Sequence, residues 1–172
     1  MLLAEAAGVE VNEALAAAAA RYAGLLRGAL DENLVSVVLF GSVARGEAGP
    51  DSDIDVLVVC ETLPAGRFAR LRLLERADQA FEKELDRLQA RGMRTRLSLV
   101  VKTRDEAARV VPLYLDLVED ARLLHDRDGF FTGVLERLRS ALARHGAERR
   151  ILGRVRYWVL KRDFRPGDVV EL

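Results

Sequence analysis

The first forty residues separate into a helical pattern and a strand-like pattern. Apolar side chains recur at roughly helical spacing through an alanine-rich stretch, at Val11, Leu15, Ala18, Tyr22, Leu25 and Leu30. This spacing predicts an opening amphipathic helix that ends near residues 31–33. The next run, 34–40, is short, apolar and rich in β-branched residues, and it stops at a glycine. We therefore expect a buried strand there.

Residues 41–52 carry three glycines and a proline, so they predict a turn and a loop, with one or two helical turns from Val43. Beyond them the pattern predicts a strand over 54–59, a long amphipathic helix over 68–88 that is ended by Gly92, and a third strand over 95–101. The remaining expected elements are a helical turn at 105–110, a helix over 112–118, an edge strand at 121–125 and a last helix over 131–142.

This order of elements predicts an α+β fold of the α/β type, in which a small mixed β-sheet is flanked by helices. A C-terminal helical and basic extension follows the sheet. We expect residues 1–125 to form the core and residues 126–172 to form the extension, both within one compact domain.

Composition changes this picture little. The chain has 172 residues, of which 50% are apolar, with 27 basic and 27 acidic side chains, which is ordinary for a globular protein. A formal net charge of zero argues against a protein whose whole surface binds nucleic acid. No leader-like segment and no apolar run near the ~20 residues of a membrane span is visible. The sequence therefore predicts a cytoplasmic protein with no membrane contact.

Cysteine and histidine offer little chemistry. The single cysteine, Cys60, cannot form an intramolecular disulfide, and it ends an apolar run, which is typical of a buried side chain. His125 and His145 lie far apart in the sequence without the spacing of zinc ligands. We therefore expect no zinc site.

Two carboxylates lie two residues apart where the second strand begins. Residues two apart share one face of a strand, so Asp53 and Asp55 project side by side, while Ile54, Val56 and Val58 project into the core. Like charges at this range repel unless a cation lies between them. Oxygen ligands favour magnesium or manganese over zinc. The pair alone is more typical of solvent-facing acids at the start of a strand, and the preceding turn is what favours a metal site.

The turn after the first strand is the second candidate. Gly41 permits close approach of the backbone, and exposed N–H groups together with the Ser42 hydroxyl can bind phosphate. Arg45 adds a positive charge one helical turn further on. By itself a Gly-Ser pair indicates only a turn, but followed by two carboxylates it indicates a nucleotide site.

Together these residues resemble a known signature. Leu39-Phe40-Gly41-Ser42, followed after ten residues by Asp53-Ile54-Asp55, resembles the motif of the polymerase-beta-like nucleotidyltransferases. Within it, Phe-Gly-Ser-Val-Ala-Arg-Gly and Ser52-Asp53-Ile54-Asp55 are similar to the minimal nucleotidyltransferases of bacteria and archaea. The motif covers about residues 34–59, and the next helix and strand fit the order of the family. Residues 157–168 resemble the closing segment of a longer subset.

The resemblance implies a nucleotidyltransferase-like fold with a two-metal site. That site transfers a nucleoside monophosphate, expected to be AMP, from a nucleoside triphosphate such as ATP to a hydroxyl acceptor. The residues implied to bind the phosphates of the nucleotide are Gly41, Ser42, Arg45 and Ser52, and the catalytic residues that hold Mg²⁺ or Mn²⁺ are Asp53 and Asp55. Small members often pair with a helical HEPN protein as the antitoxin half of a toxin–antitoxin system, which makes such a protein the expected partner.

One part of the family pattern is absent from this sequence. The family places a third carboxylate on the next strand, where this chain has Arg96 and Ser98, and the acids Asp105 and Glu106 fall after that strand. Either one of these acids reaches back to the metal site, or the chain is a catalytically weak nucleotide-binding or partner-binding module, antitoxin-like, without the third carboxylate. Both alternatives stay open at this stage.

The C-terminal stretch turns basic after Arg144 and carries the pair Tyr157-Trp158. Arginines contact phosphates and aromatic side chains stack on bases, so a nucleic-acid binder is a third interpretation. A helix surface followed by a strand that packs the only tryptophan explains the same residues more simply. The acceptor, the nucleotide base and the formation of a homo-oligomer stay open.

Overall fold

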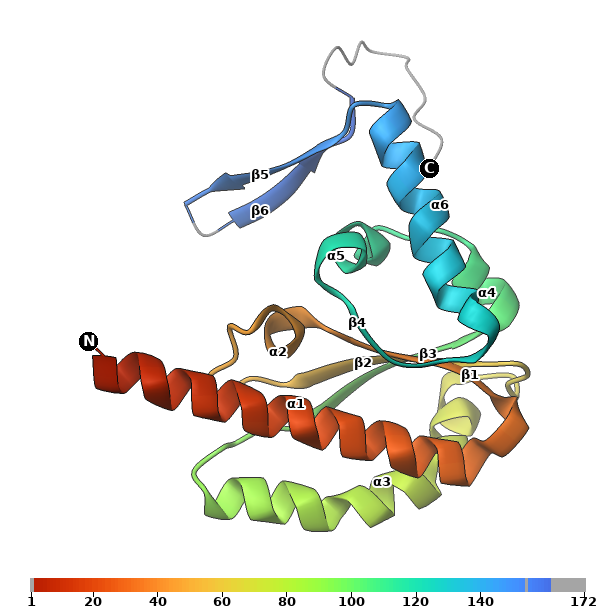
Figure 1. The fold of residues 1–172 in the computed structure, drawn as a ribbon. Helices are drawn as coiled ribbons and strands as arrows, with labels where there is room; N and C mark the ends of the chain where they lie inside the picture. The colour runs from red at the N-terminus through yellow and green to blue at the C-terminus, as the bar shows by residue number, and fades with distance from the viewer. Residues whose placement is uncertain (1, 154, 162–172) are drawn as a thin grey trace.

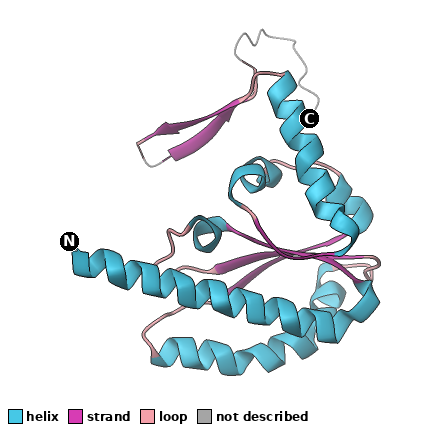
Figure 2. Ribbon diagram, in the orientation of Figure 1, coloured by secondary structure: helices cyan, strands magenta, loops and turns pink. Residues whose placement is uncertain are grey.

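One mixed sheet of four strands, with helices on both faces, forms the body of the protein (Figures 1 and 2). The computed structural model describes residues 2–153 and 155–161, with side chains for 8–153 and 156–161. In chain order the elements are α1 (Leu2–Leu30), η1 (Asp31–Asn33), β1 (Leu34–Phe40), α2 (Gly41–Arg45), β2 (Ile54–Cys60), α3 (Arg67–Ala90), β3 (Leu97–Thr103), α4 (Arg104–Ala108), α5 (Leu113–Asp120), β4 (Arg122–Asp126), η2 (Arg127–Gly129), α6 (Phe130–Arg144), β5 (Glu148–Leu152) and β6 (Val155–Val159). The predicted α+β fold is confirmed.

The strand directions bring four strand ends to one edge of the sheet. Its order is β3-β2-β1-β4, with β1 antiparallel to both neighbours and β2 parallel to β3. The end of β1 and the starts of β2, β3 and β4 therefore lie at the same edge of the sheet. The register pairs Phe40 with Asp55, and Asp55 in turn with Ser98. The glycine turn and the two carboxylates consequently share this edge.

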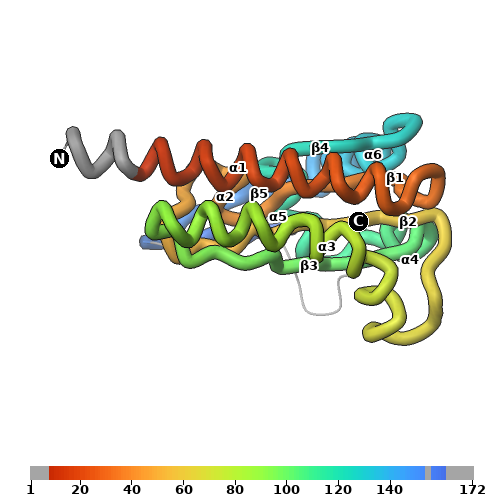
Figure 3. The backbone as a smooth tube through the Cα atoms, turned by 90° about the horizontal axis from the view of Figure 1, so that it is seen from below, coloured from red at the N-terminus to blue at the C-terminus, as the bar shows by residue number. Residues whose placement is uncertain are grey.

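One face of the sheet is covered by α1 and α3, which lie side by side (Figure 3). The rings of Tyr22 and Phe81 meet edge-on between these helices, with centroids 5.1 Å apart. Cys60 is buried in the same core, where burial raises the pKa of its thiol to about 11. The alternation predicted for the second strand is confirmed, because this core also contains Ile54, Val56 and Val58.

The other face is covered by α4, α5 and α6 (Figure 1). Tyr114 of α5 and Phe131 of α6 meet edge-on at a centroid distance of 5.3 Å. Leu57 and Val59 of β2 belong to this second core, and Trp158 of β6 packs against it. In the part of the chain that the structure describes, no helix has the length and apolar character needed to cross a membrane.

Two helices begin earlier than predicted. The first is helical from Leu2, well before Val11, because leucine, alanine and glutamate, which make up most of residues 2–10, have high helix propensity. The second begins at Gly41 and not at Val43. The left-handed φ of 73° at Gly41 turns the chain sharply enough for the helix to follow the strand without a loop.

The third strand and the basic tail also differ from the prediction. β3 begins at Leu97, because its pairing with β2 starts where the Ile54 N–H donates a 2.9 Å hydrogen bond to the carbonyl of Arg96. After α6 the tail forms an antiparallel hairpin, β5–β6, and not a helix surface followed by one strand. The chain reverses there around Gly153, whose φ is +62°. Residues 162–168 of the segment that resembles a family subset lie outside the described residues.

Candidate active site

Gly41 approaches Asp55 so closely that no side chain fits between them. A Cβ built on Gly41 would lie 2.2 Å from Oδ2 of Asp55. The φ of 73° is a second reason for glycine at this position. As a result, the turn that carries Ser42 lies directly against a carboxylate of β2.

Asp53 immediately precedes β2, and Asp55 is its second residue. Side chains alternate along a strand, and Leu57 belongs to the second core, so Asp55 lies on the face covered by α4, α5 and α6. Burial raises the pKa of Asp55, and the charge of Asp53 raises it further, against the opposing effect of a hydrogen bond with Ser98. Asp55 is therefore harder to ionise than an exposed aspartate.

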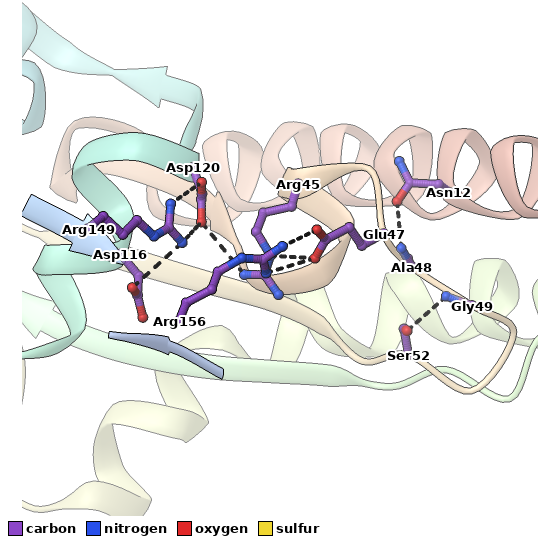
Figure 4. A network of polar contacts seen from close by, with 10 residues as sticks. All are labelled: Asn12, Arg45, Glu47, Ala48, Gly49, Ser52, Asp116, Asp120, Arg149 and Arg156. Atoms are coloured by element: carbon purple, nitrogen blue, oxygen red, sulfur yellow. Dashed lines mark hydrogen bonds and ion pairs between the residues drawn. The ribbon is translucent and has the colours of Figure 1, made fainter. Parts of the chain in front are cut away.

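Hydrogen bonds hold the loop between α2 and β2 in one conformation. The Gly49 N–H donates to the Ser52 hydroxyl at 3.0 Å, and the Ser52 N–H donates to the Gly49 carbonyl at 3.1 Å (Figure 4). The Ala48 N–H donates to the buried side chain of Asn12 at 3.1 Å, which ties the loop to α1. The Ser52 hydroxyl closes a turn as an acceptor, and its own proton stays available for a phosphate oxygen.

Arg45 belongs to a chain of alternating charges (Figure 4). Its Nε donates to Oε2 of Glu47 at 2.8 Å, and its Nη1 lies 3.9 Å from Oδ2 of Asp120. Glu47 also accepts hydrogen bonds from Arg156, and Asp120 accepts two from Arg149, at 2.6 and 2.8 Å. Hydrogen bonds from Arg156, and then from Arg45, lower the pKa of Glu47 to about 2. Arg45 thus lies beside the glycine turn with its charge shared between two carboxylates.

Arg149, Arg156 and Asp120 were not among the site residues expected from the sequence. The only signal was the basic character of the chain after Arg144, which says nothing about the side chains that those arginines contact. The partners Arg156 and Glu47 are 109 residues apart. Only the folded hairpin brings them together.

Ser98 is one of the two residues expected near the position of the missing third carboxylate. This residue lies level with Asp55 in the parallel pairing of β2 and β3. Arg96, two residues earlier, places its Nε 3.1 Å from both carboxylate oxygens of Asp53. A hydroxyl and a guanidinium thus contact the two carboxylates where the family pattern has an acid.

Asp105 and Glu106 lie at the opposite end of the sheet. Thr103 ends β3 level with Cys60, about 16 Å from Ser98 at ~3.3 Å per residue. Glu106 accepts hydrogen bonds from Arg70 at 2.7 and 2.8 Å and forms a capping box with Thr103 at the start of α4. The hypothesis that one of these acids reaches back to the metal site is therefore wrong, because the length of a strand separates them.

The donor atoms at the site fit a magnesium or manganese ion that is shared with a nucleotide. Among the residues that the structure describes, no group of three His, Cys, Asp or Glu side chains could hold a metal ion. Mg²⁺ commonly uses only one or two protein carboxylates and completes its coordination with water and substrate phosphates. The oxygens of Asp53 and Asp55, with the Ser98 hydroxyl nearby, form such an incomplete set.

Two hollows flank the carboxylates. One of about 210 Å³ lies between α2 and α5 and is lined by Phe40, Gly41, Arg45, Leu113, Asp116, Leu117 and Asp120. The other, of about 420 Å³, includes Asp53, Arg96, Gln89 and Met93 in its wall. A larger hollow of about 740 Å³, between Val110 and α6, shares no residue with either. One hollow thus adjoins the glycine turn, and the other adjoins Asp53.

Comparison with known proteins agrees with this arrangement. The family model of the nucleotidyltransferase domain matches residues 25–124, which contain both motifs. A relative from Methanocaldococcus jannaschii, named "Putative protein adenylyltransferase MJ1305", is 31% identical over 114 residues, which are 66% of this chain and 73% of the relative.

Solved structures of toxin–antitoxin proteins were also found. The crystal structure of a toxin–antitoxin with AMP-PNP is 20% identical, with a TM-score of 0.44, and the match covers 72% of this chain and 88% of that one. The toxin–antitoxin MntA-HepT is 19% identical, with a TM-score of 0.42, and covers 75% and 91%. From the match over residues 25–124, the chain belongs to the nucleotidyltransferase domain family, as its two motifs predicted.

Proposed function

We propose that the chain transfers AMP from ATP to a hydroxyl group of a protein, with Mg²⁺ or Mn²⁺ as cofactor. The observation that carries the proposal is the close approach of Gly41 to Asp55, which joins a phosphate-binding turn to a metal-binding carboxylate. The name of the relative from Methanocaldococcus jannaschii supports AMP as the transferred group and a protein as the acceptor.

Each residue has a distinct proposed role. Gly41, Ser42, Arg45 and Ser52 bind the phosphates of the nucleotide, and Asp53 and Asp55 hold the metal ion. The bound ion supplies positive charge close to the α-phosphate and the pyrophosphate. The acceptor oxygen forms its bond to the α-phosphorus as the bond to pyrophosphate breaks on the opposite side, and the hydroxyl proton is lost to solvent.

The partner follows from the same motif. The resemblance to minimal nucleotidyltransferases supports a helical HEPN-type protein as the acceptor, in a cytoplasmic toxin–antitoxin pair. The hollow beside Gly41, at about 210 Å³, gives room for only a part of the nucleotide, which we take to be its phosphates, and the hollow beside Asp53 gives room for the acceptor side chain. The reacting atoms would then meet at the carboxylates between the two hollows.

A labelling assay tests the proposal. The purified chain is incubated with Mg²⁺, ATP labelled at the α-phosphate, and extract of the cells from which the chain derives, and labelled proteins are separated and identified by mass spectrometry. We expect one labelled protein, with weaker labelling from CTP, GTP or UTP. Asp53→Asn and Asp55→Asn should each abolish the label, whereas Asp86→Asn on the exposed surface of α3 should retain it.

Three other outcomes of the labelling assay would contradict parts of the proposal. ATP binding without label in any protein would identify the chain as a nucleotide-binding module without transfer. Label in RNA, with none in protein, would replace the protein acceptor by a nucleic acid. Equal labelling by the Asp55→Asn variant would show that the carboxylates are not the metal site.

A further inference from the structure

The β5–β6 hairpin contributes two side chains to the surroundings of the nucleotide turn, although it lies outside the residues 25–124 that the family model matches. Arg156 donates to Glu47, with an Nη1–Oε2 distance of 3.0 Å, and Arg149 donates to both oxygens of Asp120 (Figure 4). Arg45 lies between these two carboxylates and contacts both. The hairpin therefore meets the site through charge pairs.

Only one face of the hairpin makes these contacts. In the antiparallel register Arg149 pairs with Trp158 and Ile151 pairs with Arg156, so these four side chains share a face. Trp158 packs against the second hydrophobic core, which anchors that face to the protein. Arg150 pairs with Tyr157 on the opposite face. Arg150 is thus a matched residue on the same strand that points away from the site.

The hairpin arginines change the net charge beside the turn. Glu47, Asp116 and Asp120 carry three negative charges, and Arg45, Arg149 and Arg156 carry three positive charges in contact with them. Without the hairpin, Arg45 would be the only one of these three arginines left beside the three carboxylates. A triphosphate is a polyanion, so uncompensated acids beside its binding turn would repel it.

Arg156 also changes what Arg45 can do. Arg45 and Arg156 both donate to Oε2 of Glu47, at 2.8 and 3.0 Å. If Arg45 turned toward a phosphate, Glu47 would keep its contact with Arg156 and would not be left unpaired. Without Arg156, moving Arg45 to the phosphate would leave the Glu47 carboxylate without a cation. That costs more free energy than a move in which Glu47 keeps a second arginine partner.

We propose that Arg149 and Arg156 are positioning residues for nucleotide binding, which neutralise Asp120 and Glu47 and so leave Arg45 free to contact the triphosphate. This inference rests on the proposed function, since it takes ATP as the nucleotide. It makes the C-terminal hairpin a part of the active site that the matched family region does not contain.

Titration calorimetry of the full chain with ATP and Mg²⁺ tests the inference. We expect Arg156→Ala and Arg149→Ala each to raise the Kd for ATP by about three- to tenfold. Arg156→Lys should recover part of the loss, and Arg150→Ala should bind ATP like the wild type. The losses should shrink as the salt concentration rises, because screening weakens the repulsion.

A double variant separates neutralisation from a merely structural role or a direct contact. Glu47→Gln removes the charge that Arg156 compensates, so Glu47→Gln combined with Arg156→Ala should bind ATP more tightly than Arg156→Ala alone. If Arg156 touched the phosphates itself, or only held the hairpin in place, the double variant would bind no better. Melting temperatures measured alongside show whether each variant is folded.

Failure of this inference can be distinguished from failure of the proposed function. Wild-type affinity in both Arg149→Ala and Arg156→Ala would overturn the inference and leave the proposed function intact. A double variant that binds as weakly as Arg156→Ala would overturn it as well. If the wild-type chain bound no ATP, the proposed function would fail first, and the inference would fail with it.

Discussion

The carboxylate of Asp55 occupies the space that a side chain on Gly41 would need. A Cβ at residue 41 would lie 2.2 Å from Oδ2 and 3.1 Å from Cγ of Asp55. The turn proposed to bind phosphate and the carboxylate proposed to bind metal are therefore in direct contact, so a change in one must displace the other.

Gly41→Ala should damage stability and metal binding together. The left-handed φ alone costs about 1–3 kcal/mol with a side chain, and the new methyl group must also displace the Asp55 carboxylate. We expect a lower free energy of unfolding in urea and loss of the stabilisation that Mg²⁺ and ATP give to the wild type. Gly46→Ala is the control, because Gly46 has a φ of +79° but no atom within 4 Å of its built Cβ. It should lose stability and keep the response to Mg²⁺ and ATP, and an equal response in Gly41→Ala would contradict the prediction.

Asp55 should make the metal-free protein less stable at neutral pH. Burial raises its pKa above the ordinary value of 3.8, so the folded state binds the proton more tightly than the unfolded state. Ionisation therefore costs stability as pH rises from about 3.8 through the raised pKa, and the cost is absent below that window. Asp55→Asn should melt at or above the wild-type temperature near pH 7, with a difference that shrinks toward pH 3, while transfer falls by about a hundredfold or more. If Asp55→Asn melted at a lower temperature than the wild type near pH 7 without metal, ionised Asp55 would not be destabilising, and the prediction would be wrong.

Glu106 should matter for folding and not for transfer. Its carboxylate accepts hydrogen bonds from Arg70 and from the Thr103 N–H at the start of α4, and these contacts, the first of them most, lower its pKa to about 2 from 4.5. The stability it contributes is present above about pH 4.5 and is lost as pH falls toward 2. Glu106→Gln should lower the free energy of unfolding by about 0.5–1 kcal/mol near pH 7, with transfer per folded molecule unchanged. If Glu106→Gln kept normal stability but lost most of its transfer activity, the prediction would be wrong and Glu106 would have a role in transfer.

Ser98→Asp should restore a third carboxylate beside the metal site. Ser98 lies level with Asp55, so an acid there adds a third negative ligand to two that already repel one another. We expect the metal-free variant to be less stable, and the concentration of Mg²⁺ that half-saturates transfer to fall by about tenfold. Ser98→Asn has the same size without the charge and should show neither change. An unchanged Mg²⁺ requirement in Ser98→Asp would mean that this position does not face the metal.

Much of the fold could be predicted because its signals are local. The run from Leu34 to Phe40, the glycine turn and the acids of the second strand are each readable from neighbouring residues, since strand alternation and glycine backbone freedom act over a few positions. The level pairing of Asp55 with Ser98 is different, because a parallel register depends on where the connecting helix returns the chain.

The β5–β6 hairpin could not be predicted from patterns of neighbouring residues. Its strand β5 carries glutamate and two arginines, which suit a helix surface as well as a strand. The contacts that fix it join Arg149 to Asp120 and Arg156 to Glu47, across separations of 29 and 109 residues. The order of residues already put Asp105 and Glu106 after the third strand, but the pairing of Thr103 with Cys60 was needed to show that they lie far from Asp53 and Asp55.

Because Cys60 is buried, the native chain should react only slowly with reagents that label thiols. It is the only cysteine of the chain, and its sulfur is enclosed by the core beneath the sheet with its pKa raised to about 11. A cysteine introduced in place of Arg150, on the outward face of the hairpin, would therefore take a maleimide dye at a single place. The fluorescence anisotropy of that dye would show whether the mobility of the hairpin changes as nucleotide is added.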